Sequence, residues 1–269
     1  MHSSGGSGGP GRGGAAGDSP FLTGRWEHLA MISYACPGEL LDPLVPNGTE
    51  LDAPDGTPRV TLVGFMFRDT RALGVPVPFH RDFEEVNLRF YVRRHDGDGD
   101  RRGVVFIREL VPRRAIAAVA RHVYQERYLS VPMDHRVDLV DGEIPAGGTV
   151  EYGWRFAGSR QLMRCLVSGE ADDVEPGSEA EFITEHYWGY AAQRDGSTVE
   201  YAVAHPRWRV HPVSETFVEG NLAPLYGAEF ARVLASPPVS AFVATGSAIA
   251  VGRGHRMPAG SGSGGDARA

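Results

Sequence analysis

The stretch ITEHYWGY at residues 183–190 combines bulky side chains that favour β-structure with groups that could do chemistry. Glu185 supplies a carboxylate, His186 an imidazole, and Tyr187 and Tyr190 phenols. Such groups serve as general bases, general acids or oxyanion donors when their pKa values suit the reaction. We therefore take Glu185 and His186 as candidate catalytic residues and Tyr187 as a candidate ligand contact.

A second polar row lies in EEVNLRFYVRR at residues 84–94. In a strand, alternate side chains share a face. One face here is apolar, and the other carries the candidate ligand-binding residues Glu85, Asn87, Arg89 and Tyr91. That polar face either meets solvent or lines the interior of a barrel. In a barrel interior, Arg89 is suited to bidentate recognition of an anionic ligand.

The histidines do not form a metal motif. His135, His205 and His211 are scattered over separate segments and, with His186, show no i, i+2 or i, i+4 pairing. Metal sites in proteins bring such ligands together at short, regular spacings. We expect no metal site and no cofactor.

The chain contains no lysine, so all 27 of its positively charged side chains are arginines. Imine-forming enzymes attack the substrate carbonyl with a lysine amine. No side chain of this protein can therefore form a Schiff base.

Composition and charge argue against several classes of protein. Of the 269 residues, 42% are hydrophobic and the formal net charge is −7, which favours neither a nucleic-acid nor an anionic-membrane partner. Cys36 and Cys165 form no disulfide framework or CxxC motif. The first twenty residues lack the apolar segment of a secretion signal, and no apolar run is long enough to span a bilayer. The sequence therefore predicts a soluble, cytoplasmic protein.

Period-2 alternation dominates between the two ends of the chain and predicts strands at 59–67, 84–94, 103–110, 149–156, 161–169, 180–190, 198–205, 207–213 and 240–251. Short turn signals between them are typical of an antiparallel sandwich or barrel. Two helices, at 112–125 and 221–238, are expected to flank the β-structure. Residues 21–257 are expected to form a single domain, with disordered Gly/Ser-rich tails at 1–20 and 258–269.

The predicted strand at 180–190 limits how ITEHYWGY could act. Alternation places Glu185 and His186 on opposite faces of this strand. They could then enter one pocket together only if a bulge near Gly189 re-aimed one of them.

Several segments in order resemble an uncharacterised bacterial family, the domain of unknown function 2071 (YqjF-like) proteins. They include FLTGRWEHLAMISY, FEEVNLRFYV, VPRRAIAAVARHVYQERYLSVPMDH, GSEAEFITEHYWGYAAQ, EYAVAHPRWRV and LYGAEFARVLASPPVSAFVATGSAIAV. The likeness covers nearly everything between the tails. This family is similar to the acetoacetate decarboxylase superfamily, which implies a mainly β fold, an antiparallel β-barrel with a few flanking helices around a polar pocket.

The resemblance also implies roles for particular residues. It places Arg25 and the row from Glu85 to Arg89 near the pocket, and it makes Glu126, Tyr128 and His135 candidates for the pocket rim. Glu126 is a further candidate general base. The decarboxylases of the superfamily use a Schiff-base lysine, which this chain lacks.

Three functional hypotheses follow. In the first, a pocket binds or acts on a small anionic carbonyl or carboxylate compound, through acid–base chemistry of the lyase or isomerase type without lysine. In the second, the barrel is a non-catalytic ligand-binding module with a degenerate site. In the third, the protein is structural and its polar residues satisfy one another. Assembly into a homo-oligomer is compatible with each of them.

Overall fold

A computed structural model describes residues 19–76, 81–97, 99–112 and 127–257. The helix expected at 112–125 and the candidate base Glu126 fall almost entirely outside these residues. Among the helices that are described, none is both long enough and apolar enough to cross a bilayer.

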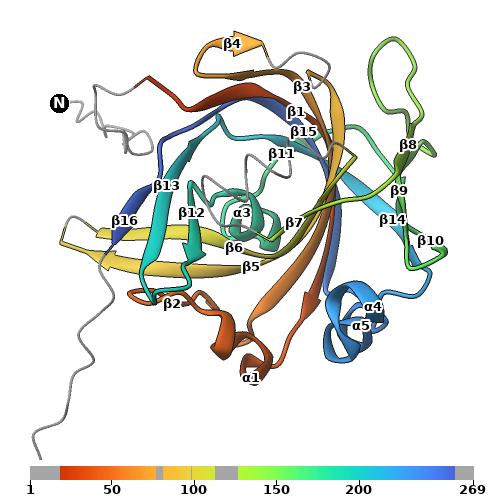
Figure 1. Ribbon diagram of the computed structural model, residues 1–269. Coiled ribbons are helices and arrows are strands. Elements are labelled where there is room, and N and C mark those ends of the chain that lie inside the picture. The colour runs from red at the N-terminus through yellow and green to blue at the C-terminus, as the bar shows by residue number, and fades with distance from the viewer. Residues whose placement is uncertain (1–18, 77–80, 98, 113–126, 258–269) are drawn as a thin grey trace, which may run out of the picture.

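The centre of the molecule is a closed ring of long strands (Figure 1). Hydrogen-bonded neighbours follow the order β13–β12–β6–β5–β3–β1–β15, and β15 pairs with β13 to close the ring. The pairs are antiparallel except for the parallel pair of β12 and β6. The ring strands are β1 (Leu22–Ala35), β3 (Arg59–Ala72), β5 (Phe83–Asp96), β6 (Gly99–Val111), β12 (Trp188–Ala192), β13 (Thr198–Ala204) and β15 (Ser240–Val251).

A second, smaller sheet packs against one side of the ring (Figure 1). It contains β8 (Met133–Val137), β9 (Thr149–Phe156), β10 (Ser159–Val167) and β14 (Arg209–Glu219), and β14 joins it to β15. Short strands β2 (Glu50–Leu51), β4 (Val75–Pro76), β7 (Tyr128–Ser130), β11 (Asp172–Asp173) and β16 (His255–Met257) extend the edges. The fold is therefore mainly β, and the described strands reproduce the ring that the sequence predicted.

The helices within the described residues are short. They are α1 (Gly38–Leu41), the 3₁₀ turn η1 (Asp42–Leu44), α3 (Glu179–Thr184), α4 (Ala223–Tyr226) and α5 (Ala228–Leu234). The single helix expected at 221–238 is thus two helices. Gly227, with φ +87, separates them because that left-handed conformation does not belong to an α-helix.

The expected strand at 180–190 is wrong in its first half. Residues Glu179–Thr184 form helix α3, and β12 begins only at Trp188. Ser178 caps the helix by accepting a hydrogen bond from the backbone N–H of Glu181 (3.1 Å), and Glu181 accepts one from the N–H of Gly177 (2.7 Å). Glu185 and His186 therefore lie in the connection after a helix, and strand alternation does not govern their directions.

The ring strands separate two hydrophobic cores. The outer core lies between the ring, the second sheet and helices α4 and α5, and includes Leu88, Phe90, Tyr152 and Trp154. The inner core lies inside the ring and includes the Phe182 and Ile183 side chains of α3. In Figure 1 α3 is seen within the ring of strands, and because its side chains belong to the inner core, the helix occupies one end of the ring. Both faces of the long strands are consequently buried.

Gly64 shows how closely the second sheet approaches the ring. A Cβ atom at this position would lie 2.5 Å from Cδ2 of Tyr152 and 2.9 Å from Sδ of Met163. Both side chains are completely buried in the outer core, so neither can move away freely.

We expect Gly64→Ala to reduce the free energy of unfolding by about 1–3 kcal/mol because the added methyl overpacks this contact. Urea denaturation measures the change. Gly97→Ala is the control, since a Cβ at Gly97 meets nothing within 4 Å. Equal stability of Gly64→Ala and the wild type would contradict this account of the interface.

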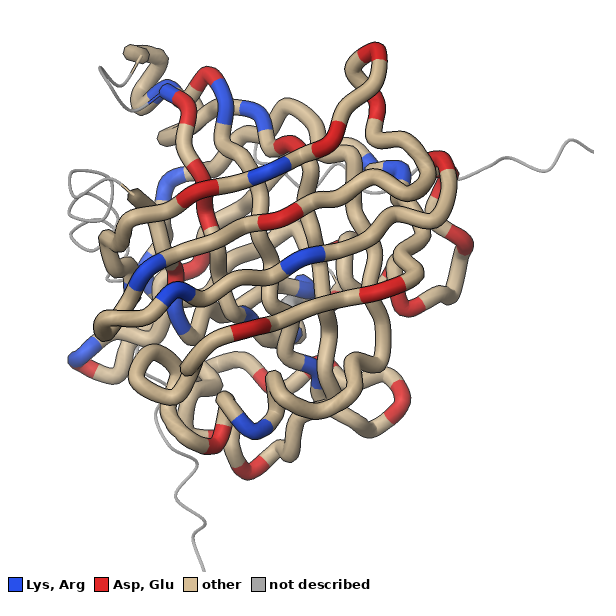
Figure 2. The backbone as a smooth tube through the Cα atoms, turned by 90° about the vertical axis from the view of Figure 1, so that its right-hand side faces the viewer, with Lys and Arg blue, Asp and Glu red and all other residues tan. Residues whose placement is uncertain are grey.

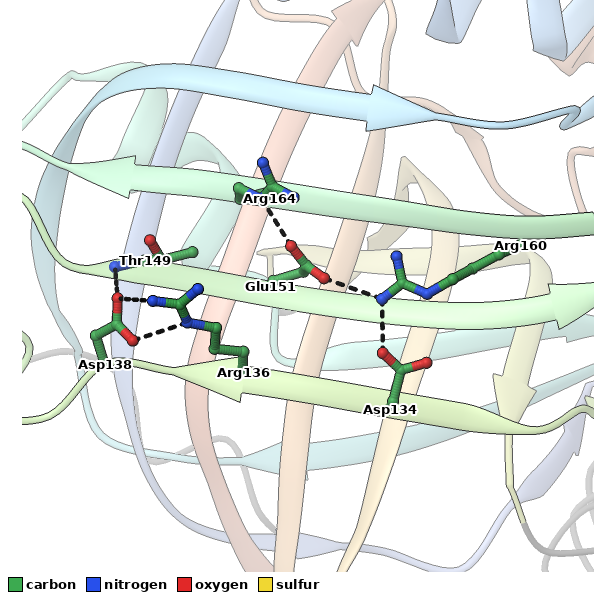
Figure 3. Close-up of polar contacts among 7 residues, drawn as sticks. All are labelled: Asp134, Arg136, Asp138, Thr149, Glu151, Arg160 and Arg164. Atoms are coloured by element: carbon green, nitrogen blue, oxygen red, sulfur yellow. Dashed lines mark hydrogen bonds and ion pairs between the residues drawn. The ribbon is translucent and has the colours of Figure 1, made fainter.

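The outward face of the second sheet carries charges of both signs, interspersed along its strands (Figure 2). Glu151 of β9 accepts from Arg164 (2.7 Å) and Arg160 (3.0 Å) of β10, and Arg160 also reaches Asp134 of β8 (2.6 Å) (Figure 3). Exposed ion pairs of this kind contribute little stability individually. Charges beside the edge strand β8 do discourage pairing with another sheet.

Candidate functional site

The barrel pocket is a cavity of about 250 Å³ inside the ring, and its wall is largely apolar. We use this name for the cavity whose polar lining residues include Glu85, Asn87, Arg89, Glu109, Thr184 and His186. Its aromatic lining residues include Trp26, Phe65, Phe67, Phe83, Phe106 and Trp208. An apolar cavity with a few convergent polar groups is the usual form of a small-molecule site.

The polar row of β5 points into this pocket. Alternation sends Val86, Leu88 and Phe90 to the outer core, and it sends Glu85, Asn87 and Arg89 to the pocket. Of the two alternatives for this face, the barrel interior is the one found. The Asn87 side-chain amide donates to Oε1 of Glu85 (3.1 Å), so the row is connected internally.

Arg89 carries the only positive charge among the described residues that line the pocket, because the two histidines there are held neutral by burial. Its Nη2 donates to the carbonyl oxygen of Ile183 (3.2 Å), in the last turn of α3, where a cation is favourable. Its guanidinium lies 5.6 Å from the ring centre of Tyr91. No described carboxylate pairs with Arg89, and its Nε is buried without a hydrogen-bond partner. The Arg89 guanidinium thus has no direct carboxylate partner among the described residues, although Glu85 and Glu109 line the same pocket.

A β-bulge brings Glu109 into the pocket. The pairing of β5 with β6 shifts register between Leu88 and Arg89, where one extra residue of β6 is accommodated. Val105 and Ile107 point to the outer core, and regular alternation would send Glu109 after them. With the bulge, Glu109 instead lines the pocket, where its side chain is 1% exposed.

A second bulge shapes the opposite wall. The pairing of β1 with β3 shifts between Glu27 and Ala30, and His28 there has φ +55. As a result Trp26 and Leu29, three residues apart, both line the pocket. Trp26 packs edge-on against Phe65 (5.3 Å between ring centres) and Trp208 (6.0 Å).

His186 lies beside α3 at the closed end of the pocket. Burial lowers its pKa to about 4, so the imidazole is neutral near pH 7. Its Nε2 lies 3.5 Å from Oδ2 of Asp52, at the limit of a hydrogen bond, and its ring is 4.7 Å from that of Tyr91. Burial opposes ionisation of Asp52, but contacts with His186 and Arg102 outweigh it and keep the pKa of Asp52 below its usual value.

Two further candidates form a pair that does not line the pocket. The Tyr187 hydroxyl donates to Oε2 of Glu185 (2.6 Å), and Arg207 Nε lies 3.3 Å from the same oxygen. Burial, together with the Glu185 carboxylate, raises the pKa of Tyr187. The Tyr187 ring lies 4.8 Å from that of His205, which does line the pocket. Glu185 and Tyr187 are therefore placed behind the pocket wall.

Of the other candidate residues from the sequence, Arg25, Tyr91 and His135 do not line the pocket. Arg25 is about half exposed and its Nε donates to Glu27 (3.2 Å), so it lies outside the ring while the next residue, Trp26, points inward. Tyr91 is buried beyond the pocket lining, and its hydroxyl donates to Thr61 (2.7 Å). His135 pairs with Glu84 (2.7 Å) on the surface. Glu126 lies outside the described residues.

Several pocket residues were missed from the sequence, of which Glu109, Trp26, Thr184, His205 and Trp208 matter most. Glu109 had a signal: it is the one carboxylate on an otherwise apolar face of its segment. The sequence also contained a signal for the helix that positions Thr184 and His186. Ser178 and Glu181 have the spacing of a capping box.

Burial lowers the pKa of His205 as it does that of His186. His205 stacks on Trp208, with 4.1 Å between ring centres, and so extends the aromatic wall of the pocket. Among the described residues, no group of three or more histidine, cysteine, aspartate or glutamate side chains could hold a metal ion. In the part of the chain that the structure describes, the ionisable groups of the pocket thus include one arginine, two buried carboxylates and neutral imidazoles.

Comparison with known proteins places both the sequence and the fold. The sequence model of the DUF2071 family, which is described as an uncharacterized conserved protein, matches residues 23–248. No curated protein matches the chain. Among solved structures, the chain is similar to an acetoacetate decarboxylase-like enzyme from Sphingomonas wittichii RW1. The two share 16% identity over 90% of this chain and 95% of that one, with a TM-score of 0.65.

Two other solved structures are similar at a TM-score of 0.61. One is acetoacetate decarboxylase from Legionella pneumophila, 13% identical over 89% of this chain and 88% of that chain. The other is the enduracididine biosynthesis enzyme MppR complexed with pyruvate, 12% identical over 92% and 94%. At these identities the likeness shows the fold, which is that of the acetoacetate decarboxylases, as the family resemblance implied.

Proposed function

We propose, from the premise that this chain belongs to the uncharacterized DUF2071 family, that its barrel pocket binds a small carbonyl or carboxylate compound as the anion. The observation that carries the proposal is Arg89, a partly buried arginine on the wall of an apolar cavity, which has no described carboxylate partner and whose buried Nε has no hydrogen-bond partner. Partial burial of a cation without a direct partner is costly, and an anionic ligand that paired with it would relieve part of that cost. The pyruvate bound to MppR, a protein of the same fold, is a ligand of this class.

The pocket also contains groups suited to proton transfer. The carboxyl groups of Glu85 and Glu109 line the same cavity as Arg89 and are 3% and 1% exposed. With the ligand carboxylate held by Arg89, Glu109, which pairs with Asn87, two residues from Arg89 on β5, would be the nearer group to take a proton from the carbon beside the ligand carbonyl, giving an enol or enolate. His186, being neutral, could share a hydrogen bond with the ligand. An imine on a side-chain amine is excluded because the chain has no lysine.

A non-catalytic binding module is the second candidate, and the absence of lysine favours it. Exchange of the ligand's α-protons with deuterated solvent, monitored by NMR, distinguishes a catalytic pocket from a binding module. Exchange that depends on Glu109 supports proton abstraction. Binding without exchange supports the binding module.

We expect pyruvate to raise the midpoint of thermal unfolding, because a ligand that binds only the folded protein stabilises it. Pyruvamide, which has the same shape without the charge, is expected to give a much smaller shift. The measurement is a thermal-shift titration at constant ionic strength. Equal shifts from acid and amide would show that the carboxylate is not recognised, and the proposal would fail.

A further inference from the structure

The barrel pocket is elongated, and its chemistry differs between its two ends. Arg89 and Phe83 both line it, and they lie six residues apart on β5, which corresponds to roughly 20 Å along the strand. Arg89 is at the end closed by α3, where it bonds to Ile183. Phe83 stacks on Phe67 at the other end, with 4.8 Å between ring centres.

The end remote from Arg89 is apolar. Leu22 pairs with Ala72 on one side and with Val251 on the other, and all three residues line the pocket. Thr70 is the one polar side chain that the pocket gains near this end from β3. A ligand that reaches this region from Arg89 must therefore present apolar surface to it.

The volume of the cavity is too large for the smallest ligands of the proposed class. About 250 Å³ is equivalent to about eight water molecules at ~30 Å³ each. Pyruvate, with six non-hydrogen atoms, would leave much of this space empty or filled with water against aromatic walls. Transfer of apolar groups from water into such a space is favourable.

Resting on the proposed function, we infer that the ligand is an amphipathic carboxylic acid with an aromatic body. Its carboxylate pairs with Arg89, and its ring lies against the aromatic residues contributed by β1, β3 and β5. Asn87, two residues from Arg89 on β5, flanks the part of the ligand next to the carboxylate. The inference names a substrate class for the pocket and goes beyond the recognition of an anion.

Calorimetric titration of the full chain with pyruvate, 4-methyl-2-oxopentanoate and phenylpyruvate tests this inference. We expect phenylpyruvate to bind at least tenfold more tightly than pyruvate, with the branched acid between them. Equal affinities for phenylpyruvate and pyruvate would overturn the inference and leave the proposed function standing. If no acid of the series binds, or if 3-phenylpropanol binds as tightly as phenylpyruvate, the proposed function itself fails.

A matched pair of variants locates the aromatic body. Ala72→Phe fills the remote end of the pocket and is expected to weaken phenylpyruvate binding at least tenfold while leaving pyruvate binding unchanged. Ala248→Phe is the control, because Ala248 is exposed on β15 and does not line the pocket. Unchanged phenylpyruvate binding by a folded Ala72→Phe variant would place the ring elsewhere and overturn the inference. The acid series on the wild type remains decisive if Ala72→Phe does not fold.

Discussion

Arg89→Met is expected to weaken carboxylate binding by about thirtyfold or more, since loss of one partner of a desolvated charge pair costs about 2–5 kcal/mol. The variant removes the guanidinium and retains an unbranched side chain of comparable length. Calorimetric titration with the tightest-binding acid of the series measures the change in Kd.

The same substitution is expected to leave the free protein at least as stable as the wild type. Arg89 has no described ion-pair partner, so its removal strands no direct carboxylate partner and eliminates a partly buried charge that lacks one. If Arg89 serves ligand binding, its replacement leaves the midpoint of thermal unfolding unchanged or raised. If Arg89 serves the fold, the replacement lowers that midpoint. A large loss of stability in Arg89→Met would show that the guanidinium serves the fold.

Arg59→Met provides the matched control. Arg59 is also largely buried, but it pairs with Glu179 (2.8 Å) and Asp55 (2.6 Å) and does not line the pocket. This variant should lose stability and retain the ligand affinity of the wild type. Retention of wild-type affinity by Arg89→Met would contradict the assignment of Arg89 as the anion contact.

The stability of the protein is expected to fall as the pH is lowered from 7 to 5, and His186 is expected to contribute about 2 kcal/mol of that fall. Its pKa is about 4 in the folded protein, against about 6.5 in an unfolded chain. Between these values the unfolded chain binds a proton that the folded protein does not. The contribution of His186 to stability is therefore complete above pH 6.5 and declines toward pH 4.

Urea denaturation of the wild type and His186→Gln at pH 7 and pH 5 measures this contribution. The variant should show a smaller pH-dependent loss, while the loss that remains reflects groups such as His28 and His205, whose pKa values burial also lowers. His95→Gln is the control of opposite sign. Bonds to Asp100 and Glu50 raise the pKa of His95, so its removal should steepen the loss. An identical pH dependence for His186→Gln and the wild type would refute the neutral, buried imidazole.

The part of the site on β5 could be predicted because that strand is regular. From Glu85 to Arg89 its side chains alternate strictly, so the sequence revealed which residues share a face. The sequence could not decide whether that face met solvent or a cavity. The decision depends on ring closure by β13 and β15, which pair residues nearly fifty positions apart.

The parts of the site that were missed lie beside irregularities. Trp26 and Glu109 enter the pocket only because bulges in β1 and β6 break the period of two. For the same reason strand β1 did not stand out as a strand in the sequence. Pattern reasoning fails at a bulge because one inserted residue reverses the face of every residue beyond it.

His186 was identified as a candidate by its residue type, while its position was predicted from the wrong element. The segment before it has the β-branched and aromatic residues of a strand, but the cap at Ser178 and the packing of Phe182 and Ile183 inside the ring favour a helix. Tertiary packing of this kind commonly overrides local propensity. Arg25 entered through the family resemblance alone, and the structure places it outside the ring.

The division of the protein into two cores bears on how such a molecule can diversify. The larger cluster of buried side chains is the outer core, where the ring meets the second sheet and helices α4 and α5. Most of the hydrophobic burial that keeps the chain folded is thus placed on the side of each strand that faces away from the pocket. Substitutions on the inward faces can then accumulate with limited loss of stability. A protein built on this plan can exchange the residues of its pocket, and with them its ligand, while the scaffold persists.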